Sequence, residues 1–332
     1  MAAVNNFTRK KTILFHFSEK HKDYIRKCRD CSYNVAEGAV RAGKTVDNVF
    51  AFAHELKTTP DKIHLATGST MANAKMNIGD CNGMGLEWIF RGQSHWGKYK
   101  DNEALFIKGP TTHNKQKIVI FAGGAKEDSF KKIRGNSYGM WIATEINLHH
   151  DNTIKEAFNR QLAAKRLKVF WDLNPDNPRA AIYSEYIDRY QRQQEEGNFP
   201  GGYNYMHCTI YDNINITPER LHEIESRYDV NSIWYMRDIK GMRVVANGLI
   251  FRRFADDIST KKFGFALKEK PKDIMEINLG IDFGGSGSGH SFTATAITRG
   301  FQMVIPLASE WISCKDESGN PIEIDPDMLG KM

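Results

Sequence analysis

Eight residues near the N-terminus constrain the fold of this chain more than any other part of the sequence. They run from Gly38 to Thr45 and match the pattern G-x-x-x-x-G-K-[ST] at every fixed position. An apolar stretch, Tyr33–Ala36, precedes them and an amphipathic stretch, Val46–Leu56, follows them, which predicts a strand, a tight loop and a helix. Such a loop wraps backbone N–H groups around phosphate at a helix N-terminus. A chance glycine-rich turn is the alternative, and the complete octet in this setting disfavours it.

Several positions of the octet have a predicted role. Lys44 can reach the outer phosphates of a nucleotide, and the Thr45 hydroxyl can ligate its Mg²⁺. Arg41 is unusual inside such a loop. It is either a solvated surface arginine or a cation that stabilises the charge of a transferring phosphoryl group. The predicted nucleotide-binding residues are Gly38, Ala39, Val40, Arg41, Ala42, Gly43, Lys44 and Thr45.

The first half of the chain alternates between apolar runs and amphipathic stretches. This alternation favours an α/β fold, with a mainly parallel sheet covered by helices on both faces. The runs Ala104–Lys108 and Lys115–Ala122 are instead predicted to be an inserted strand pair. The predicted strands are Tyr33–Ala36, Ile63–Ala66, Ile118–Ala122, Met140–Ile146 and Leu167–Asp172, and the predicted helices are Val46–Leu56, Ala72–Phe90, Thr153–Ala164 and Arg179–Glu196.

Two breaks divide the chain into three predicted parts. The first break, EEGNFPGGYN, ends at residue 204 and precedes a predicted strand, Tyr205–Ile210, and two short helices. The second, KEKPKDI, begins at residue 268 and is a polar linker that contains a proline. The segment after it has the pattern of a strand, a glycine-rich turn and another strand. We predict a nucleotide-hydrolysing domain over 1–204, a linker or lid subdomain over 205–268, and the beginning of another domain over 269–332.

Composition indicates the environment of the protein. Of the 332 residues, 41% are hydrophobic and 26% are charged, which is ordinary for a soluble domain with a sizeable core. No run approaches the roughly 18 apolar residues of a membrane helix, and the N-terminus lacks a signal pattern. We therefore expect a cytoplasmic protein that has no membrane partner. The net charge of +6 suits a polyanionic partner without by itself indicating one. The lone C-x-x-C pair, Cys28 and Cys31, is expected to hold reduced thiols.

A carboxylate follows one of the predicted core strands, in the segment GMWIATEINLHH (139–150). Glu145 is placed there to orient the water that attacks the γ-phosphate. A satisfied strand-end carboxylate is the alternative, and the presence of the phosphate loop favours the catalytic interpretation. The position before such a glutamate usually carries an aspartate that helps to hold Mg²⁺, and here it is Thr144. Either a hydroxyl and water substitute for that aspartate, or hydrolysis is slower.

Two further polar residues lie next to predicted strands. Arg134, in KKIRGNSYG, precedes the strand that leads to Glu145. It can remain solvated, contact DNA, or reach the γ-phosphate of a neighbouring subunit as a finger in trans. Asn174, in FWDLNPDNP, follows the next strand and can sense the γ-phosphate, while Pro175 fixes the turn that follows.

Together these segments resemble the large terminase subunit of tailed bacteriophages. The resemblance rests on GAVRAGKT, the IRG segment, the strand ending in Glu145, the LNPDNP turn and GIDFG after a linker. Their order and spacing match from about residue 15 to residue 300. The resemblance implies a P-loop NTPase fold of the ASCE type (additional strand, catalytic glutamate), then a small linker subdomain and the beginning of a ribonuclease-H-like nuclease domain.

The same resemblance implies an activity and a set of partners. The protein would be an ATP-driven molecular motor that moves double-stranded viral DNA into a procapsid through the portal. Its metal-dependent endonuclease would cut concatemeric DNA. The implied partners are the portal protein, the small terminase subunit and further copies in a pentameric ring, with a monomer in solution as the other state. The implied location is the host cytoplasm and not the mature virion.

The resemblance also assigns roles residue by residue. Lys44 and Thr45 would bind ATP with its Mg²⁺, Glu145 would be the catalytic acid and Asn174 the coupling residue. The arginine-finger candidates are Arg41 in cis and Arg134 in trans. Two positions depart from the family pattern: His21 lies near the place of a glutamine that recognises adenine, and Asp172 replaces a more usual small hydroxyl residue.

Asp282, in LGIDFGGSGSGH, is the candidate for a second chemistry. On the first strand of a nuclease sheet it would bridge two Mg²⁺ or Mn²⁺ ions. The same phrase binds phosphate in sugar-kinase and actin-like ATPases, and an aspartate that caps the turn is a third interpretation. Its position after a linker favours the nuclease, but Asp325 and Asp327 follow too closely to complete a metal site. We therefore expect a truncated nuclease domain and ATPase activity without robust DNA cleavage.

Two other functions compete with the packaging motor. A helicase or repair-type ATPase with an appended nuclease would carry a second motor domain after residue 205, where only short helices are predicted. A non-catalytic, nucleotide-gated scaffold is compatible with Thr144. ATP turnover by the parent protein separates the scaffold from the motor.

Overall fold

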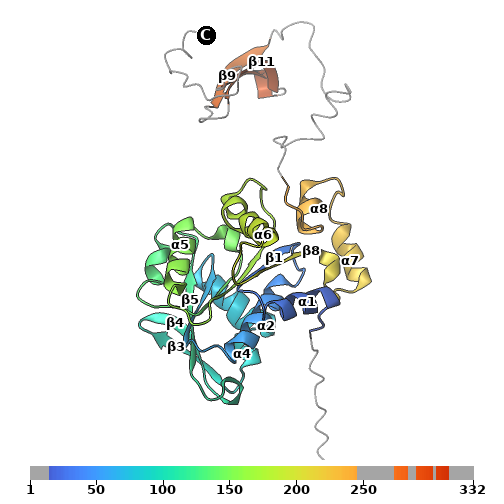
Figure 1. Cartoon of the computed structure of the whole chain (residues 1–332). Coiled ribbons are helices and arrows are strands. Elements are labelled where there is room, and N and C mark those ends of the chain that lie inside the picture. The colour runs from blue at the N-terminus through green and yellow to red at the C-terminus, as the bar shows by residue number, and fades with distance from the viewer. Residues whose placement is uncertain (1–14, 245–272, 283–288, 302–303, 314–332) are drawn as a thin grey trace, which may run out of the picture. The chain divides into compact units, whose positions relative to one another are not determined.

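The computed structural model describes residues 15–244, 273–282, 289–301 and 304–313 (Figure 1). The chain forms two compact units, Met1–Gly248 and Leu249–Met332. The first contains an eight-stranded sheet covered by helices, and the second contains a three-stranded antiparallel sheet. Among the described residues, no helix is long and apolar enough to cross a membrane.

The elements of the first unit follow one another as strand and helix along most of its length. Its helices are α1 (Glu19–Lys27), α2 (Lys44–Leu56), α3 (Met71–Ala74), α4 (Leu86–Ile89), α5 (Asp151–Gln161), α6 (Asp188–Glu195), α7 (Pro218–Glu225) and α8 (Ile233–Asp238). Its strands are β1 (Tyr33–Gly38), β2 (Ile63–Gly68), β3 (Ser94–Tyr99), β4 (Asn102–Ile107), β5 (Lys117–Gly123), β6 (Met140–Ala143), β7 (Lys168–Leu173) and β8 (Tyr203–Cys208).

The strand order is β3-β4-β5-β2-β6-β7-β1-β8, and neighbouring strands run parallel from β5 to β8. This confirms the predicted α/β class with a mainly parallel sheet. The predicted strand pair is also present, since β4 and β5 run antiparallel with Leu105 opposite Val119. Strand β3, which the sequence pattern does not predict, extends this pair into a three-stranded edge. Strand β7 lies between β1 and β6, so the strands before the phosphate loop and before Glu145 are not neighbours.

The core has two layers, one on each face of the sheet. Consecutive side chains of a strand point to opposite faces. Accordingly, Ala36 of β1 and Ile142 of β6 pack in the layer that contains α2, whereas Val35 and Trp141 pack in the layer that contains α5. Both faces are therefore buried, which explains why the central strands are almost continuously apolar.

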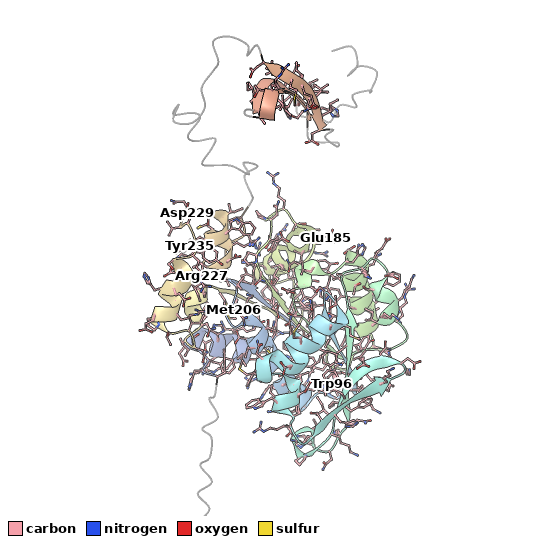
Figure 2. The ribbon with its side chains drawn as sticks, turned by 180° about the vertical axis from the view of Figure 1, so that it is seen from behind. Trp96, Glu185, Met206, Arg227, Asp229 and Tyr235 are labelled. Atoms are coloured by element: carbon pink, nitrogen blue, oxygen red, sulfur yellow. The ribbon has the colours of Figure 1, made fainter. Side chains whose placement is uncertain are left out.

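The predicted helix Ala72–Phe90 is instead broken into short pieces. Only α3 and α4 are α-helical, and a π-helical turn, Lys75–Asp80, lies between them. Left-handed backbone at Cys81 and Asn82 interrupts the helix. Trp96 of β3, labelled in Figure 2, supports this irregular segment from the sheet edge: its Nε1 donates to Glu87, and the Lys75 ammonium lies 4.4 Å from its ring centroid.

The second unit is a sheet of three antiparallel strands in the order β11-β10-β9. These strands are β9 (Ile274–Asp282), β10 (His290–Thr298) and β11 (Val304–Ile312). The predicted pattern of a strand, a glycine-rich turn and another strand thus has two described strands, β9 and β10.

The predicted division into three domains stays a prediction. Its boundary between residues 204 and 205 falls inside β8, which is hydrogen-bonded to β1 along its length. The polypeptide therefore continues in the large sheet past the predicted boundary. The second predicted boundary, between 268 and 269, lies outside the described residues, as do Asp325 and Asp327.

Candidate nucleotide-binding site

The phosphate loop joins β1 to α2, as its sequence predicts. The backbone is left-handed at Arg41, with φ 60°, and at Gly43, with φ 100°. At Gly38 there is no room for a side chain, because a Cβ atom there would lie 2.0 Å from the carbonyl oxygen of Cys208 in β8. The loop then delivers Lys44 as the first residue of α2. The glycines are therefore needed for the backbone path and for the close approach of β8.

Lys44 is buried beneath this loop and its ammonium group is fully hydrogen-bonded. Its Nζ donates to the carbonyl oxygens of Gly38 at 2.9 Å and Ala39 at 2.6 Å, and to Oδ1 of Asn174 at 3.0 Å. An ammonium group has three N–H donors, so all are used. Burial lowers the pKa of Lys44, and the nearby carboxylate of Asp172 opposes this shift. Asn174, at the end of β7, is thus in direct contact with the lysine of the phosphate loop.

Asp172 lies in the same cavity and is the most buried carboxylate there, with 3% of its surface exposed. Its Oδ1 accepts a hydrogen bond from the Thr144 hydroxyl at 3.2 Å and from the Glu145 backbone N–H at 3.0 Å. Its Oδ2 is also buried and accepts no hydrogen bond of ordinary geometry. Burial raises the pKa of Asp172, while the Glu145 amide, the Lys44 charge and the Thr45 hydroxyl favour the charged form.

Glu145 lies two residues after the last residue of the short strand β6. The strand was predicted to reach Ile146, but it ends at Ala143 and the backbone of Glu145 is left-handed, with φ 53°. This conformation is uncommon for a residue other than glycine, and such strain occurs often at functional sites. The half-buried Glu145 side chain lines the same cavity as Lys44. Within the described ranges, no side chain donates a hydrogen bond to its carboxylate.

These groups surround one cavity of about 280 Å³ at the carboxyl ends of the strands. In open α/β sheets ligands bind at this edge. Most predicted site residues line it: Val40, Arg41, Ala42, Gly43, Lys44, Thr45, Glu145 and Asn174. Gly38 and Ala39 form the adjacent backbone that holds Lys44. A larger cavity of about 660 Å³, near Arg29 and Arg166, contains none of the predicted site residues.

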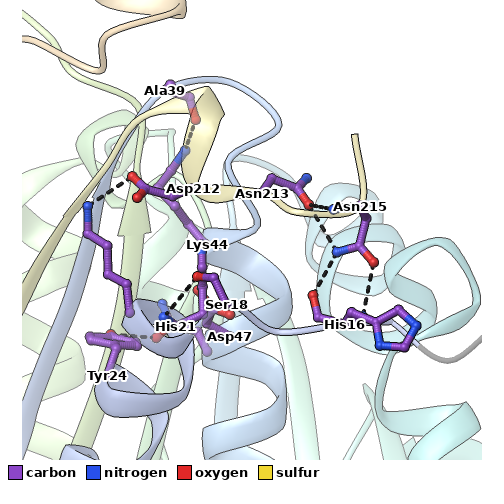
Figure 3. A network of polar contacts seen from close by, with 12 residues as sticks. His16, Ser18, His21, Tyr24, Ala39, Lys44, Asp47, Asp212, Asn213 and Asn215 are labelled. Atoms are coloured by element: carbon purple, nitrogen blue, oxygen red, sulfur yellow. Dashed lines mark hydrogen bonds and ion pairs between the residues drawn. The ribbon is translucent and has the colours of Figure 1, made fainter. Parts of the chain in front are cut away.

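Three residues singled out from the sequence lie outside this cavity. Arg134 is exposed, forms an ion pair with Glu156 at 3.3 Å and stacks on the ring of Phe130. His21 is buried, and its Nδ1 is hydrogen-bonded to Asp47, so it braces the phosphate-loop helix α2 (Figure 3). Asp282 is an exposed residue at the end of β9 in the other unit.

The segment after β8 also touches the loop, a contact that the sequence pattern does not predict. Asn213 Nδ2 donates to the Arg41 carbonyl oxygen at 2.7 Å and lines the cavity. The Val40 N–H donates to the carbonyl oxygen of Asp238, at the end of α8, at 3.1 Å. Asn215 exchanges two hydrogen bonds with the backbone of His16 (Figure 3). These residues carry no motif, and only the path of the chain brings them to the loop.

The fold and the site together define a P-loop NTPase of the ASCE type. The additional strand is β7, which lies between β1 and β6. Glu145, after β6, and the phosphate loop, after β1, line the same cavity. A family model described as "Terminase large subunit, T4likevirus-type, N-terminal" matches residues 35–256. The chain therefore belongs to the large terminase subunit family, as its resemblance indicated.

Solved structures of phage terminases share this fold. The large terminase of a thermophilic bacteriophage matches with a TM-score of 0.59 and 18% identity, over 95% of this chain and 73% of that one. The complex of the same terminase with ADP gives a TM-score of 0.59 and 19% identity over the same shares. The HK97 bacteriophage large terminase matches with a TM-score of 0.51 and 13% identity, over 88% of this chain and 63% of that one. No curated protein sequence gives a significant match.

Proposed function

We propose that this chain is the ATP-driven motor subunit that moves double-stranded viral DNA into a procapsid through its portal. Membership of the large terminase family supports this function. The observation that carries it is the convergence of Lys44, Glu145 and Asn174, from three different loops, on one cavity. The large terminase of the thermophilic bacteriophage has been solved with ADP and with ATP-γ-S, which supports ATP as the nucleotide.

In the proposed hydrolysis each side chain acts on a different part of the triphosphate. The carboxylate of Glu145 orients the attacking water and takes its proton. Lys44 and Arg41 stabilise the negative charge that develops on the transferring phosphoryl group. Bound Mg²⁺ would neutralise the phosphate oxygens, and the hydroxyl of Thr45, the first polar side chain after Lys44, fits this ion as a ligand.

Movement would pass from the loop to the segment after β8 through the contacts already described. Asn174 holds Lys44 at 3.0 Å, so a shift of the lysine toward phosphate alters the turn after β7. The backbone of the loop holds Asn213 and Asp238, which belong to the segment after β8. A movement of the loop would therefore be passed directly to α8, because Val40 is hydrogen-bonded to Asp238 at the end of that helix.

The hydrolytic role is tested by ATP turnover of purified protein, with and without DNA and procapsids. Glu145→Gln removes the base and keeps the shape, so turnover should fall by roughly 10²-fold or more while ATP-γ-S still binds. Glu185→Gln, at an exposed position in the turn before α6, is the matched control. Absence of turnover in the parent protein would favour the scaffold, and DNA-strand separation would favour the helicase.

The coupling role is tested separately. Asn174→Ala should hydrolyse ATP but not package DNA, because the link between Lys44 and the turn after β7 is lost. Asn177→Ala changes an exposed residue of the same turn and should package normally. Unimpaired packaging by Asn174→Ala would remove this residue from the mechanism.

The remaining assignments are proposals that rest on the family. Arg134, exposed and away from the cavity, is the proposed finger in trans within a pentameric ring on the portal, which the small terminase subunit would join in the host cytoplasm. Asp282 is the proposed Mg²⁺ or Mn²⁺ ligand of a ribonuclease-H-like endonuclease. In the described parts of the chain no three His, Cys, Asp or Glu side chains are grouped to hold a metal. Metal-dependent plasmid degradation that Asp282→Ala abolishes would overturn the expectation of weak cleavage.

A further inference from the structure

The end of β7 offers a buried carboxylate oxygen that the described protein leaves unused. Asp172 has 3% of its surface exposed, and its Oδ2 accepts no hydrogen bond of ordinary geometry. Burying a charged oxygen without a partner is costly, so such groups in native proteins are normally paired or bind a metal ion. Asp172 lines the nucleotide cavity together with Thr45. The oxygen therefore lies where a cation bound to phosphate would need a ligand.

The other oxygen of Asp172 is held in place from the neighbouring strand. Ala143 and Trp171 are paired across β6 and β7, so the next residues, Thr144 and Asp172, stand side by side at the strand ends. The Thr144 hydroxyl and the Glu145 backbone N–H both donate to Oδ1. With Oδ1 occupied in this way, Oδ2 is the oxygen left for a ligand. Thr144 itself is neutral and already engaged with the carboxylate.

We propose that Asp172 supplies the protein carboxylate of the nucleotide's Mg²⁺ site, and that Thr144 and the Glu145 amide orient it. The inference rests on the proposed nucleotide-binding function. Mg²⁺ commonly takes one or two carboxylates together with phosphate oxygens and water. Thr45, at the start of α2, lines the same cavity and would add a hydroxyl oxygen. Glu145 thereby stays available for the attacking water, so the two carboxylates have different tasks.

The test measures metal binding directly rather than turnover. Mn²⁺ is titrated into the protein with saturating ATP-γ-S, and free Mn²⁺ is followed by electron paramagnetic resonance. Asp172→Asn should weaken Mn²⁺ binding at least tenfold and leave nucleotide binding in EDTA intact, because the amide keeps the shape and loses the charge. Asp176→Asn, at an exposed aspartate in the turn after β7, is the matched control and should stay within threefold of the wild type.

Each outcome has a distinct meaning. Unchanged Mn²⁺ affinity in an Asp172→Asn protein that binds ATP-γ-S would overturn the inference and leave the proposed function standing. No ATP-γ-S binding by the wild type would overturn both. If the variant does not fold, Fe²⁺ with ascorbate and peroxide can cleave the wild-type backbone beside the metal. Cuts near both Thr45 and Asp172 are expected, and cuts near Thr45 alone would contradict the proposal.

Discussion

Arg243 is the residue whose loss should most weaken the structure around the phosphate loop. It lies after α8 and forms a two-pronged ion pair with Glu37, the residue before Gly38. Its Nε donates to Glu37 Oε1 at 2.9 Å and its Nη2 to Oε2 at 2.7 Å. The Glu37 side chain is fully buried, and Arg243 also packs 3.8 Å above the ring of Tyr183. The variant Arg243→Met keeps an apolar contact with that ring and removes the charge.

The expected loss of unfolding free energy arises because Glu37 would stay buried without its cationic partner. Removing one member of a buried ion pair costs about 3–5 kcal/mol, because the other charge stays buried without compensation. Glu37 retains hydrogen bonds from the hydroxyls of Tyr183 at 2.9 Å and Tyr205 at 2.8 Å, which places the cost near the lower end, at about 3 kcal/mol. For a unit of this size that corresponds to a fall in melting temperature of roughly 6–12 °C.

The assay is urea unfolding followed by the fluorescence of Trp141 and Trp171, which are fully buried in the large sheet. Asp188 is the second carboxylate partner of Arg243, and the Asp188 side chain is 43% exposed, so Asp188→Asn should cost less than about 1 kcal/mol of unfolding free energy. Adding Glu37→Gln to Arg243→Met should restore more than half of the loss, because the neutral amide can accept a hydrogen bond from one tyrosine hydroxyl and donate one to the other. Stability of Arg243→Met within about 1 kcal/mol of the wild type would show that Glu37 does not depend on the arginine, as would a double variant no more stable than the single one.

Two further predictions concern the same unit. Gly38→Ala should abolish ATP-γ-S binding in a titration, because the added Cβ would meet the Cys208 carbonyl oxygen at 2.0 Å and displace the loop; wild-type affinity would contradict this. Burial lowers the pKa of His64 to about 3. The unfolded chain, with a histidine pKa near 6.5, therefore binds protons more readily, so this contribution to stability is complete above about pH 6.5 and is lost as the pH falls toward 3. The free energy of unfolding, measured in urea between pH 7 and 4, should fall less steeply with falling pH in His64→Gln than in the wild type, by about 1.4 kcal/mol per pH unit. Parallel curves for the two proteins would exclude the effect.

The sequence was most informative where function depends on a short run of neighbouring residues. The octet Gly38–Thr45 specifies its own loop, because glycine positions and a lysine at the helix start are local requirements. Glu145 and Asn174 could be found for a similar reason, since each lies within two residues of the end of an apolar strand and the ends of parallel strands meet at one edge. The predicted helix Ala72–Phe90 failed because left-handed residues break it, and the edge of the sheet supports the broken form.

The α/β class, the phosphate loop and the strand ends that carry the candidate catalytic groups could be predicted from the order of the residues. The position of β7 between β1 and β6, which brings Asp172 beside Thr144 and Thr45, is known only from the folded chain. The folded chain also shows that Asn213 and Asp238 hold the loop, whereas His21 and Arg134 lie outside the cavity. The physical reason is that strand order and long-range contacts depend on how the two faces of the sheet are packed, and no short stretch of sequence encodes that packing.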